Sequence, residues 1–407
     1  MTHMKKFSIL ASLILGALLF TACEADRDSN PTIDLSKPQA AIHLNTPTFA
    51  IGTYDFDMTD AIEMTCTAPS YGFPATVTYA IQLSLDADMT RPNTLSTTFS
   101  NNKMEVTAKE LAIATTKQLM DKQGKKQDDF PIEVPVYIRV HAYIAGVAGS
   151  ETYSNIVKLN KVKTKFALPD VVVPDAFFVN GKFTGNDWEK SVASAPVNGN
   201  TSTHWRICWV DENGIQTSPV KGAPNYADDY ITATYKCNTN GFTVDADGVV
   251  KATTPGWYLM LMDVKVDSDK RTMEISFEFD VPEVWLIGTS IVNEAADIAK
   301  DDSDPSKVSC WSEKRLRDEK AEYCKFTTPT TMDGEFVSPK LTSKVDGDGG
   351  TRAYVKVRTY EWWKSEFFVF NKQIVYRGNG GDQERVNGAV GQRVHFKFSD
   401  DTGELKM

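Results

Sequence analysis

The chain has few of the residues that metal sites and disulfide frameworks need. Its 407 residues include five histidines and six cysteines, and no two cysteines have the Cys-x-x-Cys spacing of a zinc site. Beyond Cys23, five cysteines remain, an odd number that predicts no disulfide framework. Pairing of Cys310 with Cys324, or of Cys208 with Cys237, stays open in an oxidising compartment. We favour mostly unpaired, buried thiols, and we expect neither a metal ion nor a cofactor.

The familiar catalytic motifs are also absent. We find no Gly-x-Ser-x-Gly elbow, no phosphate-binding Gly-x-x-x-x-Gly-Lys-Ser/Thr loop and no His-Glu-x-x-His helix. Carboxylates are plentiful, so composition alone does not exclude a weak two-carboxylate glycoside hydrolase. Residues 346–350, Asp-Gly-Asp-Gly-Gly, lack the full ligand set of a calcium loop, and a flexible hairpin loop is the favoured interpretation. We therefore expect no enzyme activity.

An excess of positive charge and a membrane-spanning apolar run are missing as well. The formal net charge is −10, which argues against nucleic acid and anionic lipid as partners, because either requires a basic face. The long apolar run, Phe7 to Phe20, has only about 14 residues, fewer than the ~20 that a helix needs to cross a bilayer. With 41% hydrophobic residues, the rest of the chain is predicted to fold.

The N-terminal stretch has the order of a bacterial lipoprotein signal. Lys5 and Lys6 precede the apolar run, small residues precede Cys23, and acidic residues follow it. This pattern predicts a signal peptide over residues 1–22 and a lipid on Cys23, which would hold the protein on a membrane surface. An ordinary signal peptide with an incidental cysteine is the alternative. Residues 23–37 are polar and acidic and are predicted to be a tether.

Short alternating runs begin near residue 38. Residues 77–83, 134–143 and 155–162 alternate at a period of two and predict strands, whereas residues 107–123 have helical spacing. We interpret residues 38–165 as an immunoglobulin- or fibronectin-like sandwich with one inserted helix, a spacer without a binding site.

A weak repeat occupies the rest of the chain. Residues 173–181 recur as 281–288, and residues 256–263 have a counterpart in 391–398, each followed by a polar turn and a last strand. The repeat predicts two related β-sandwich domains, residues 166–280 and 281–407, with one helix-like exception at 294–302. The predicted fold class is therefore all-β, with three tandem β-sandwich domains after a lipoprotein signal.

All eight tryptophans follow residue 180. Sugar rings have apolar faces and hydroxyl rims, so a glycan site needs flat aromatic side chains together with polar hydrogen-bonding groups. Trp205, Trp209, Trp257 and Trp285 lie in apolar strands and are predicted to be core residues. Trp188 and Trp311 follow polar loops, and the adjacent Trp362 and Trp363 would point to opposite faces of a strand. We therefore consider Trp188, Trp311, Trp362 and Trp363 as candidate ligand contacts.

The segment Tyr376 to Val386 combines a glycine-rich bend with charged and amide groups. It reads Tyr-Arg-Gly-Asn-Gly-Gly-Asp-Gln-Glu-Arg-Val, and its glycines allow the backbone to approach another group closely. Arg377, Asp382 and Gln383 would supply donors and acceptors to sugar hydroxyls. The alternative is a structural turn pinned by internal pairing of Arg377 with Asp382.

Residues 376–386, followed by Gly391 and Gln392, closely resemble the C-terminal domain of the SusE/SusF family, surface lipoproteins of Bacteroidetes glycan-utilisation systems. Cys23 with its acidic followers and residues 30–33 are similar to the family's mature N-terminus. The resemblance implies export to the outer leaflet of the outer membrane, a first domain that binds nothing, and carbohydrate-binding modules without catalysis.

The function implied by the resemblance is capture of starch or another polysaccharide near an outer-membrane importer pair. Trp362 or Trp363, Arg377, Asp382 and Gln383 lie in or near the matching motif. The region around Trp311 departs from the starch-binding proteins, which leaves the identity of the glycan open. The alternative function is a structural or protein-binding accessory of the importer that binds no glycan.

Overall fold

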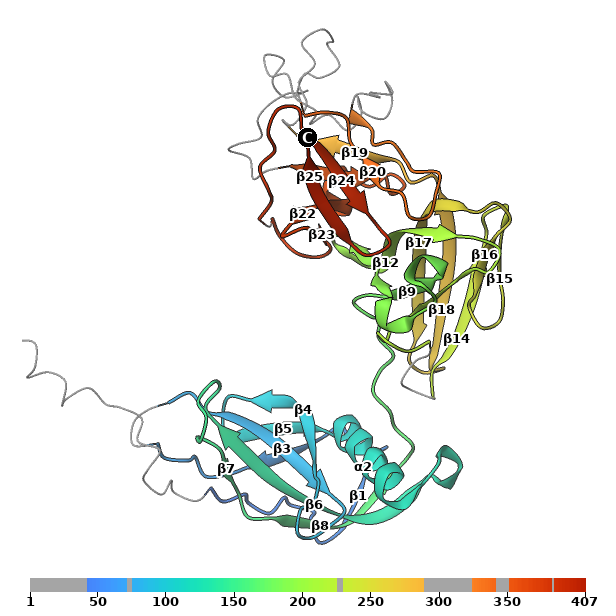
Figure 1. The fold of residues 1–407 in the computed structure, drawn as a ribbon. Coiled ribbons are helices and arrows are strands. Elements are labelled where there is room, and N and C mark those ends of the chain that lie inside the picture. The colour runs from blue at the N-terminus through green and yellow to red at the C-terminus, as the bar shows by residue number, and fades with distance from the viewer. Residues whose placement is uncertain (1–41, 72–74, 225–229, 289–323, 342–350, 383) are drawn as a thin grey trace, which may run out of the picture. The chain divides into compact units, whose positions relative to one another are not determined.

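The computed structural model describes residues 42–71, 75–224, 230–288, 324–341, 351–382 and 384–407. The chain divides into two compact units, residues 1–169 and residues 170–407, which we call the N-terminal and C-terminal units. Strands dominate both units (Figure 1), so the all-β prediction is confirmed. Among the described residues, no helix has the length and apolar character to cross a membrane.

The N-terminal unit is built on a sheet with the strand order β1-β8-β6-β3-β4, in which β7 also pairs with β6, and on a second sheet of β2 and β5. Buried apolar side chains from both sheets and from the helix form one core. The strands are β1 (Thr53–Asp55), β2 (Ala61–Thr65), β3 (Thr78–Ser84), β4 (Asn93–Phe99), β5 (Lys103–Thr107), β6 (Ile132–Tyr143), β7 (Thr152–Tyr153) and β8 (Val157–Thr164).

The predicted helix is present as α2 (Ala108–Gln123). The Thr107 hydroxyl accepts a hydrogen bond from the Glu110 backbone N–H at 3.3 Å, which caps the first turn. Gly124 ends the helix in the left-handed conformation, where glycine is favoured because it has no side chain. The predicted apolar stripe faces the core, since Leu111, Ala112, Thr115 and Leu119 are all buried.

Residues 170–280, the first half of the C-terminal unit, form two five-stranded sheets. Their strand orders are β10-β9-β13-β16-β15 and β11-β12-β17-β18-β14, and an apolar core lies between them. The elements are β9 (Phe178–Gly181), η2 (Lys182–Thr184), η3 (Trp188–Lys190), β10 (Val192–Ala193), β11 (Ala195–Val197), β12 (Asn200–Val210), β13 (Ile215–Ser218), β14 (Thr232–Cys237), β15 (Phe242–Val244), β16 (Val250–Ala252), β17 (Gly256–Asp267) and β18 (Thr272–Asp280).

Residues 281–407, the second half, form one continuous sheet with the order β19-β21-β22-β23-β25-β24-β20. Within this sheet, β23 pairs with β25 through a single residue pair, Gln373 with Thr402. Isolated bridges join residues 325–327 to both edge strands, so the sheet curves back toward its own first strand. The elements are β19 (Val284–Ile287), β20 (Phe336–Val337), β21 (Arg352–Val355), η6 (Trp362–Ser365), β22 (Glu366–Phe370), β23 (Gln373–Tyr376), β24 (Arg393–Lys397) and β25 (Thr402–Lys406).

The repeat detected in the sequence corresponds to two antiparallel hairpins, β17 with β18 and β24 with β25. Both hairpins end their half of the unit. The helix-like segment 294–302 lies outside the described residues. The division into domains at residue 280 stays a prediction, because the two halves share one core.

That shared core is centred on alternate residues of β12 and β17. One face of these strands contributes Trp205, Ile207, Trp257, Leu259 and Leu261 to a cluster with the second half, while their other face fills the core of the first half. The Trp205 ring lies 5.7 Å from that of Phe367 and 5.4 Å from that of Tyr376. Trp205, Trp257 and Trp285 are buried, which confirms their prediction as core residues, and Trp209 is a half-buried residue packed against the core.

Polar groups also bind the two halves together. Arg206, fully buried on β12, donates hydrogen bonds to the Tyr376 hydroxyl at 2.7 Å and to the Phe398 carbonyl at 2.6 Å, and it pairs with Asp401. Arg358 makes a bidentate contact with Asp263. These contacts neutralise charges that would otherwise be costly to bury. The two halves are therefore joined by specific hydrogen bonds and ion pairs as well as by apolar side chains.

Candidate functional site

The adjacent Trp362 and Trp363 do not lie on a strand. They begin the short 3-10 helix η6, which corrects the strand geometry expected from the sequence. The Ser365 hydroxyl donates to the Val355 carbonyl at 2.6 Å and so holds the end of this turn against β21. A 3-10 helix has three residues per turn, so neighbouring side chains diverge by about 120° instead of 180°. Both rings are consequently half-buried, and neither is a fully buried core residue.

Positive groups lie over both rings. The Arg352 guanidinium carbon is 5.9 Å from the centre of the Trp362 ring, and that of Arg377 is 5.5 Å from the centre of the Trp363 ring. The Lys364 ammonium is 5.2 Å from the same Trp363 ring. Cations are attracted to the electron-rich face of an indole at such distances. Partly exposed aromatic surface and hydrogen-bond donors are thus placed side by side.

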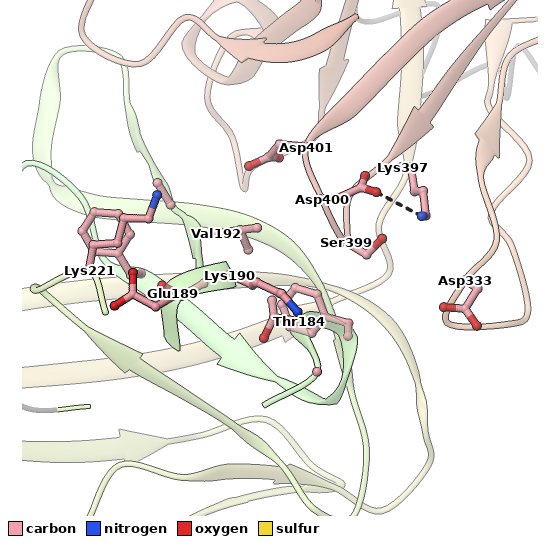
Figure 2. A pocket seen from close by; sticks show the side chains of 15 residues that line it. Thr184, Glu189, Lys190, Val192, Lys221, Asp333, Lys397, Ser399, Asp400 and Asp401 are labelled. Atoms are coloured by element: carbon pink, nitrogen blue, oxygen red, sulfur yellow. Dashed lines mark hydrogen bonds and ion pairs between the residues drawn. The ribbon is translucent and has the colours of Figure 1, made fainter. Parts of the chain in front are cut away.

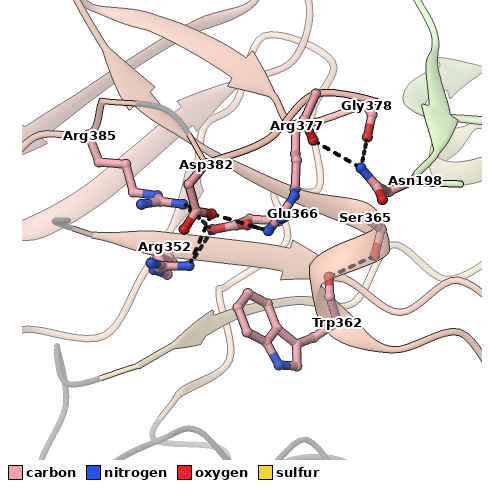
Figure 3. A network of polar contacts seen from close by, with 10 residues as sticks. Asn198, Arg352, Trp362, Ser365, Glu366, Arg377, Gly378, Asp382 and Arg385 are labelled. Carbon is pink, nitrogen blue, oxygen red and sulfur yellow. Dashed lines mark hydrogen bonds and ion pairs between the residues drawn. The ribbon is translucent and has the colours of Figure 1, made fainter. Parts of the chain in front are cut away.

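Three arginines converge on one buried carboxylate, a group we call the arginine cluster (Figure 3). Glu366, the first residue of β22, accepts hydrogen bonds from Arg377 at 2.9 Å, Arg385 at 3.1 Å and Arg352 at 3.3 Å. Glu366 has no exposed surface, and an isolated carboxylate at such a position would be strongly destabilising. The three guanidinium groups therefore supply the hydrogen bonds that a buried carboxylate needs, and Glu366 in turn orients the guanidinium groups.

Asp382 covers the outer side of this cluster. Its carboxylate is 63% exposed and lies 3.0 Å from Arg385 and 3.3 Å from Arg377. Partial burial alone would raise the pKa of Asp382, but the Arg385 hydrogen bond and the surrounding guanidinium charges outweigh that effect and lower it. The internal pairing of Arg377 with Asp382, considered as the structural alternative, is thus present.

Sequence reasoning missed two of the three arginines and the carboxylate at the centre. Arg352 belongs to β21, far from the glycine-rich segment, and no local motif connects the two. Glu366 carried one usable signal, since a single charged residue heads the apolar strand Glu366–Phe370. A buried charge needs partners, and that rule would have directed attention to Glu366. The predicted candidates Trp311, Gln383 and Cys23, together with Cys310 and the loop 346–350, lie outside the described residues.

Trp188 lies in another part of the C-terminal unit. It begins η3, and the residues that follow it line a cleft with a volume of ≈ 660 Å³ (Figure 2). Lys190, Lys221 and Lys397 contribute positive charges, and Glu189, Asp333 and Asp400 contribute negative ones. Phe183 is buried at this cleft and Phe178 is half-buried, and no tryptophan contributes to its lining. The cleft offers hydrogen-bonding groups but less flat aromatic surface than η6.

The described thiols are poor nucleophiles. Cys66, Cys208 and Cys237 are free, so the possible pair of Cys208 with Cys237 does not form in this structure. Burial raises the pKa of Cys66 to about 11 and that of Cys208 to about 12, which keeps both protonated at neutral pH. Within the part of the chain that the structure describes, no three His, Cys, Asp or Glu side chains are grouped closely enough to hold a metal ion.

Comparisons with known proteins agree with the motif in the glycine-rich segment. A family model described as "SusF/SusE starch specific CBMs" matches residues 315–404, which include η6, the glycine-rich segment and Glu366. A second model, "SusE outer membrane protein", matches residues 27–141. Together the two models cover about half of the chain.

Outer membrane protein SusF of Bacteroides thetaiotaomicron is 31% identical over 258 residues, which are 60% of this chain and 45% of that protein. The chain thus spans less than half the length of this relative.

Among solved structures, the crystal structure of SusF from Bacteroides thetaiotaomicron covers 90% of this chain and 100% of that chain, with 18% identity and a TM-score of 0.39. A structure of a bacterial ice-binding adhesin covers 78% of this chain and 84% of that chain, with 10% identity and a TM-score of 0.14. TM-scores this low support no conclusion. The two family models and the SusF relative thus show that this chain is similar to SusE and SusF proteins, in residues 27–141 and in residues 315–404.

Proposed function

We propose that this protein is a non-catalytic, cell-surface lipoprotein that binds starch or a similar polysaccharide. The observation that carries the proposal is the pair of half-buried tryptophans on η6, beside the arginine cluster. Aromatic faces supply apolar contact for sugar rings, and guanidinium groups donate hydrogen bonds to hydroxyls. The same residues fall within the match to starch-specific carbohydrate-binding modules.

The proposed site consists of Trp362, Trp363, Arg377 and Asp382, with Gln383 nearby in sequence. Arg377 and Asp382 pair with each other in the free protein. Because Asp382 is largely exposed, its carboxylate keeps acceptor positions directed to solvent while it orients Arg377. A sugar hydroxyl that donates to Asp382 and accepts from Arg377 would use both groups of the pair. Internal pairing and ligand binding are therefore compatible roles.

The rest of the chain serves to present this site. We propose that lipid on Cys23 anchors the mature protein to the outer membrane, that residues 23–37 form a tether, and that residues 38–165 act as a spacer. Residues 166–280 and 281–407 would be two carbohydrate-binding modules, with Trp188 marking a second, weaker contact in the first. An outer-membrane importer pair is the proposed recipient of the captured glycan.

The anchor can be tested separately from the glycan. Replacement of Cys23 by Ala should move the protein from the membrane fraction to the soluble fraction, because the lipid acceptor is lost. A C23A protein that remains in the membrane fraction would contradict lipid anchoring and would leave the glycan proposal untouched.

Binding is tested with affinity gels cast with single polysaccharides and run with the lipid-free chain from residue 24 onward. Stacking on protein aromatics contributes roughly 1–3 kcal/mol for each nucleic-acid base, and sugar rings should gain no more. Two platforms then predict micromolar to millimolar dissociation constants. We expect amylopectin to retard the wild type, and the double variant W362A/W363A to migrate as in a gel without polysaccharide.

W188A is the comparison variant: it removes a half-buried tryptophan of the same unit, the weaker of the proposed contacts, and should keep most of the wild-type retardation. Equal retardation of W362A/W363A and the wild type would overturn the proposed site. No retardation of the wild type by amylopectin, pullulan, xylan, mannan, β-glucan or mucin glycans would overturn glycan binding and favour the protein-binding accessory. Released oligosaccharides would instead show that the protein is an enzyme.

A further inference from the structure

The turn between β11 and β12 belongs to the first half of the C-terminal unit but contacts both parts of the proposed site in the second half. The Asn198 backbone N–H donates to the Lys364 carbonyl of η6 at 2.9 Å. The Asn198 side-chain amide donates to the carbonyl of Gly378 at 2.6 Å and to that of Gly380 at 3.1 Å (Figure 3). One residue therefore connects the tryptophan turn with the glycine-rich loop, which we define as residues 378–382.

Neighbouring contacts reinforce this connection. The Gly199 N–H donates to the Asn379 side-chain oxygen at 3.0 Å, and the Asn200 amide donates to the Tyr360 hydroxyl at 3.0 Å. Gly199 has φ 75°, a left-handed conformation in which a side chain would be strained. The turn and the loop thus form a dense set of hydrogen bonds between segments about 180 residues apart in sequence.

The proposed site needs such a connection because its parts come from separate segments. Trp362 and Trp363 belong to η6, whereas Asp382 lies at the end of the glycine-rich loop. On the loop's N-terminal side, the Arg377 N–H donates to the Glu366 carbonyl at 3.0 Å, which continues the pairing of β22 with β23. Beyond Arg377, the Asn198 amide holds the loop backbone at two points, the carbonyls of Gly378 and Gly380. A loop that must be ordered upon binding costs conformational entropy, and a loop already ordered does not.

We propose that Asn198 is a positioning residue for glycan binding: a residue of the preceding half that fixes the glycine-rich loop relative to the η6 tryptophans. The inference rests on the proposed function, and it adds that the C-terminal module binds well only when the half before it is packed in place. Polysaccharide binding then depends on residues of both halves, although Asn198 itself need not contact the sugar.

The test uses a single-atom exchange in the lipid-free protein from residue 24 onward. N198D keeps the size of the side chain and the backbone N–H, but an oxygen replaces the amide nitrogen that donates to Gly378 and Gly380. The control is E278Q, an equally small exchange in the first half. Glu278 accepts from Arg358 of the second half at 2.7 Å, so E278Q weakens the contact between the halves without altering a hydrogen bond of η6 or the loop.

Two measurements are made on both variants. Hydrogen–deuterium exchange should rise in peptides covering 362–365 and 376–386 in N198D, and it should remain at the wild-type level there in E278Q. In amylopectin affinity gels, the apparent dissociation constant should rise about tenfold for N198D, whereas E278Q should bind like the wild type. N198A, which deletes the amide without introducing a charge, should reproduce both effects if N198D proves poorly folded.

Unchanged exchange in both peptides, or unchanged amylopectin affinity of N198D and N198A, would overturn the positioning role. A similar loss of affinity in E278Q would also overturn it, because general loosening of the two halves would then explain the effect. Failure of the proposed function looks different: the wild type itself would bind no polysaccharide, while the exchange measurement would still report whether Asn198 orders the loop.

Discussion

Within the C-terminal unit, the tryptophans of β12 and β17 and those of η6 have different surroundings. Trp205 and Trp257 are 1% and 5% exposed and pack against aromatic rings of the second half. Trp362 and Trp363 are half-buried, and charged side chains lie over their rings. The first pair lies on strands that pack on both faces, whereas the second pair lies on a short turn at the edge of a core. The same residue type thus joins the two halves in one place and lies partly exposed beside charged groups in the other.

The largest effect is expected where a tryptophan joins the halves. Trp205→Ala should lower the free energy of unfolding of the C-terminal unit by about 3–5 kcal/mol, because it leaves a cavity between Trp205's neighbours Phe367 and Tyr376. Urea unfolding followed by tryptophan fluorescence measures this unit alone, since all eight tryptophans follow residue 180. A cost below about 1 kcal/mol, typical of a surface position, would show that the shared core contributes little.

The next effect concerns the arginine cluster. Glu366→Gln should cost about 3 kcal/mol, because it removes the buried negative charge and leaves three guanidinium groups without their common partner. The same urea titration measures the loss. Asp382→Asn is the matched control, and it should cost much less because Asp382 is 63% exposed and solvent screens its ion pairs. Equal costs for the two variants would mean that burial of Glu366 is not the source of its effect.

A smaller effect is expected from pH. Burial lowers the pKa of His204 below its ordinary value, and the contact with the Thr201 carbonyl offsets this only in part. The unfolded chain therefore binds a proton near pH 6.5 while the folded chain does not. Stability should be full above pH 6.5 and should fall as the pH is lowered from there through the pKa of the folded state. Urea midpoints by tryptophan fluorescence at pH 7.5, 6.5 and 5.5 measure this decline.

His204→Gln is the control for the pH effect, because glutamine cannot take up the proton. Its unfolding midpoint should depend less on pH between 7.5 and 5.5 than that of the wild type. Identical pH dependence in the two proteins would assign the decline to groups other than His204. The carboxylates of Asp263, Glu335 and Asp382 do not account for it, because their pKa values are lowered and they lose their contribution only at more acidic pH.

The smallest effect is expected from the N-terminal unit, which contains no tryptophan. A protein that begins at residue 170 should be retarded by amylopectin as strongly as the chain from residue 24, because it retains η6, the arginine cluster and Asn198. Affinity gels compare the two proteins directly. Loss of retardation in the shorter protein would contradict the role of residues 38–165 as a spacer and would extend the site to both units.

The elements that local pattern could predict were predicted well. The helix α2 begins after its capping Thr107, and the strands β3, β6 and β12 occur where apolar residues alternate. Alternation also identified Trp205 and Trp257 as core residues. These features depend on neighbours within a few positions, so a single sequence contains the information that determines them.

Tertiary structure decided the features that join distant residues. No local signal places Arg352 beside Glu366, or Asn198 beside Gly378, because chain folding brings these pairs together across 14 and 180 residues. The adjacent Trp362 and Trp363 were assigned to a strand because each is a strand former, but packing of Ser365 against β21 holds them in a turn. By itself the sequence determined the all-β class, the tryptophan-rich unit and the glycine-rich motif, since each follows from composition or spacing. Only the fold decided which tryptophans are buried between the halves and which charges surround the others, because burial and ion pairing depend on groups that meet through space.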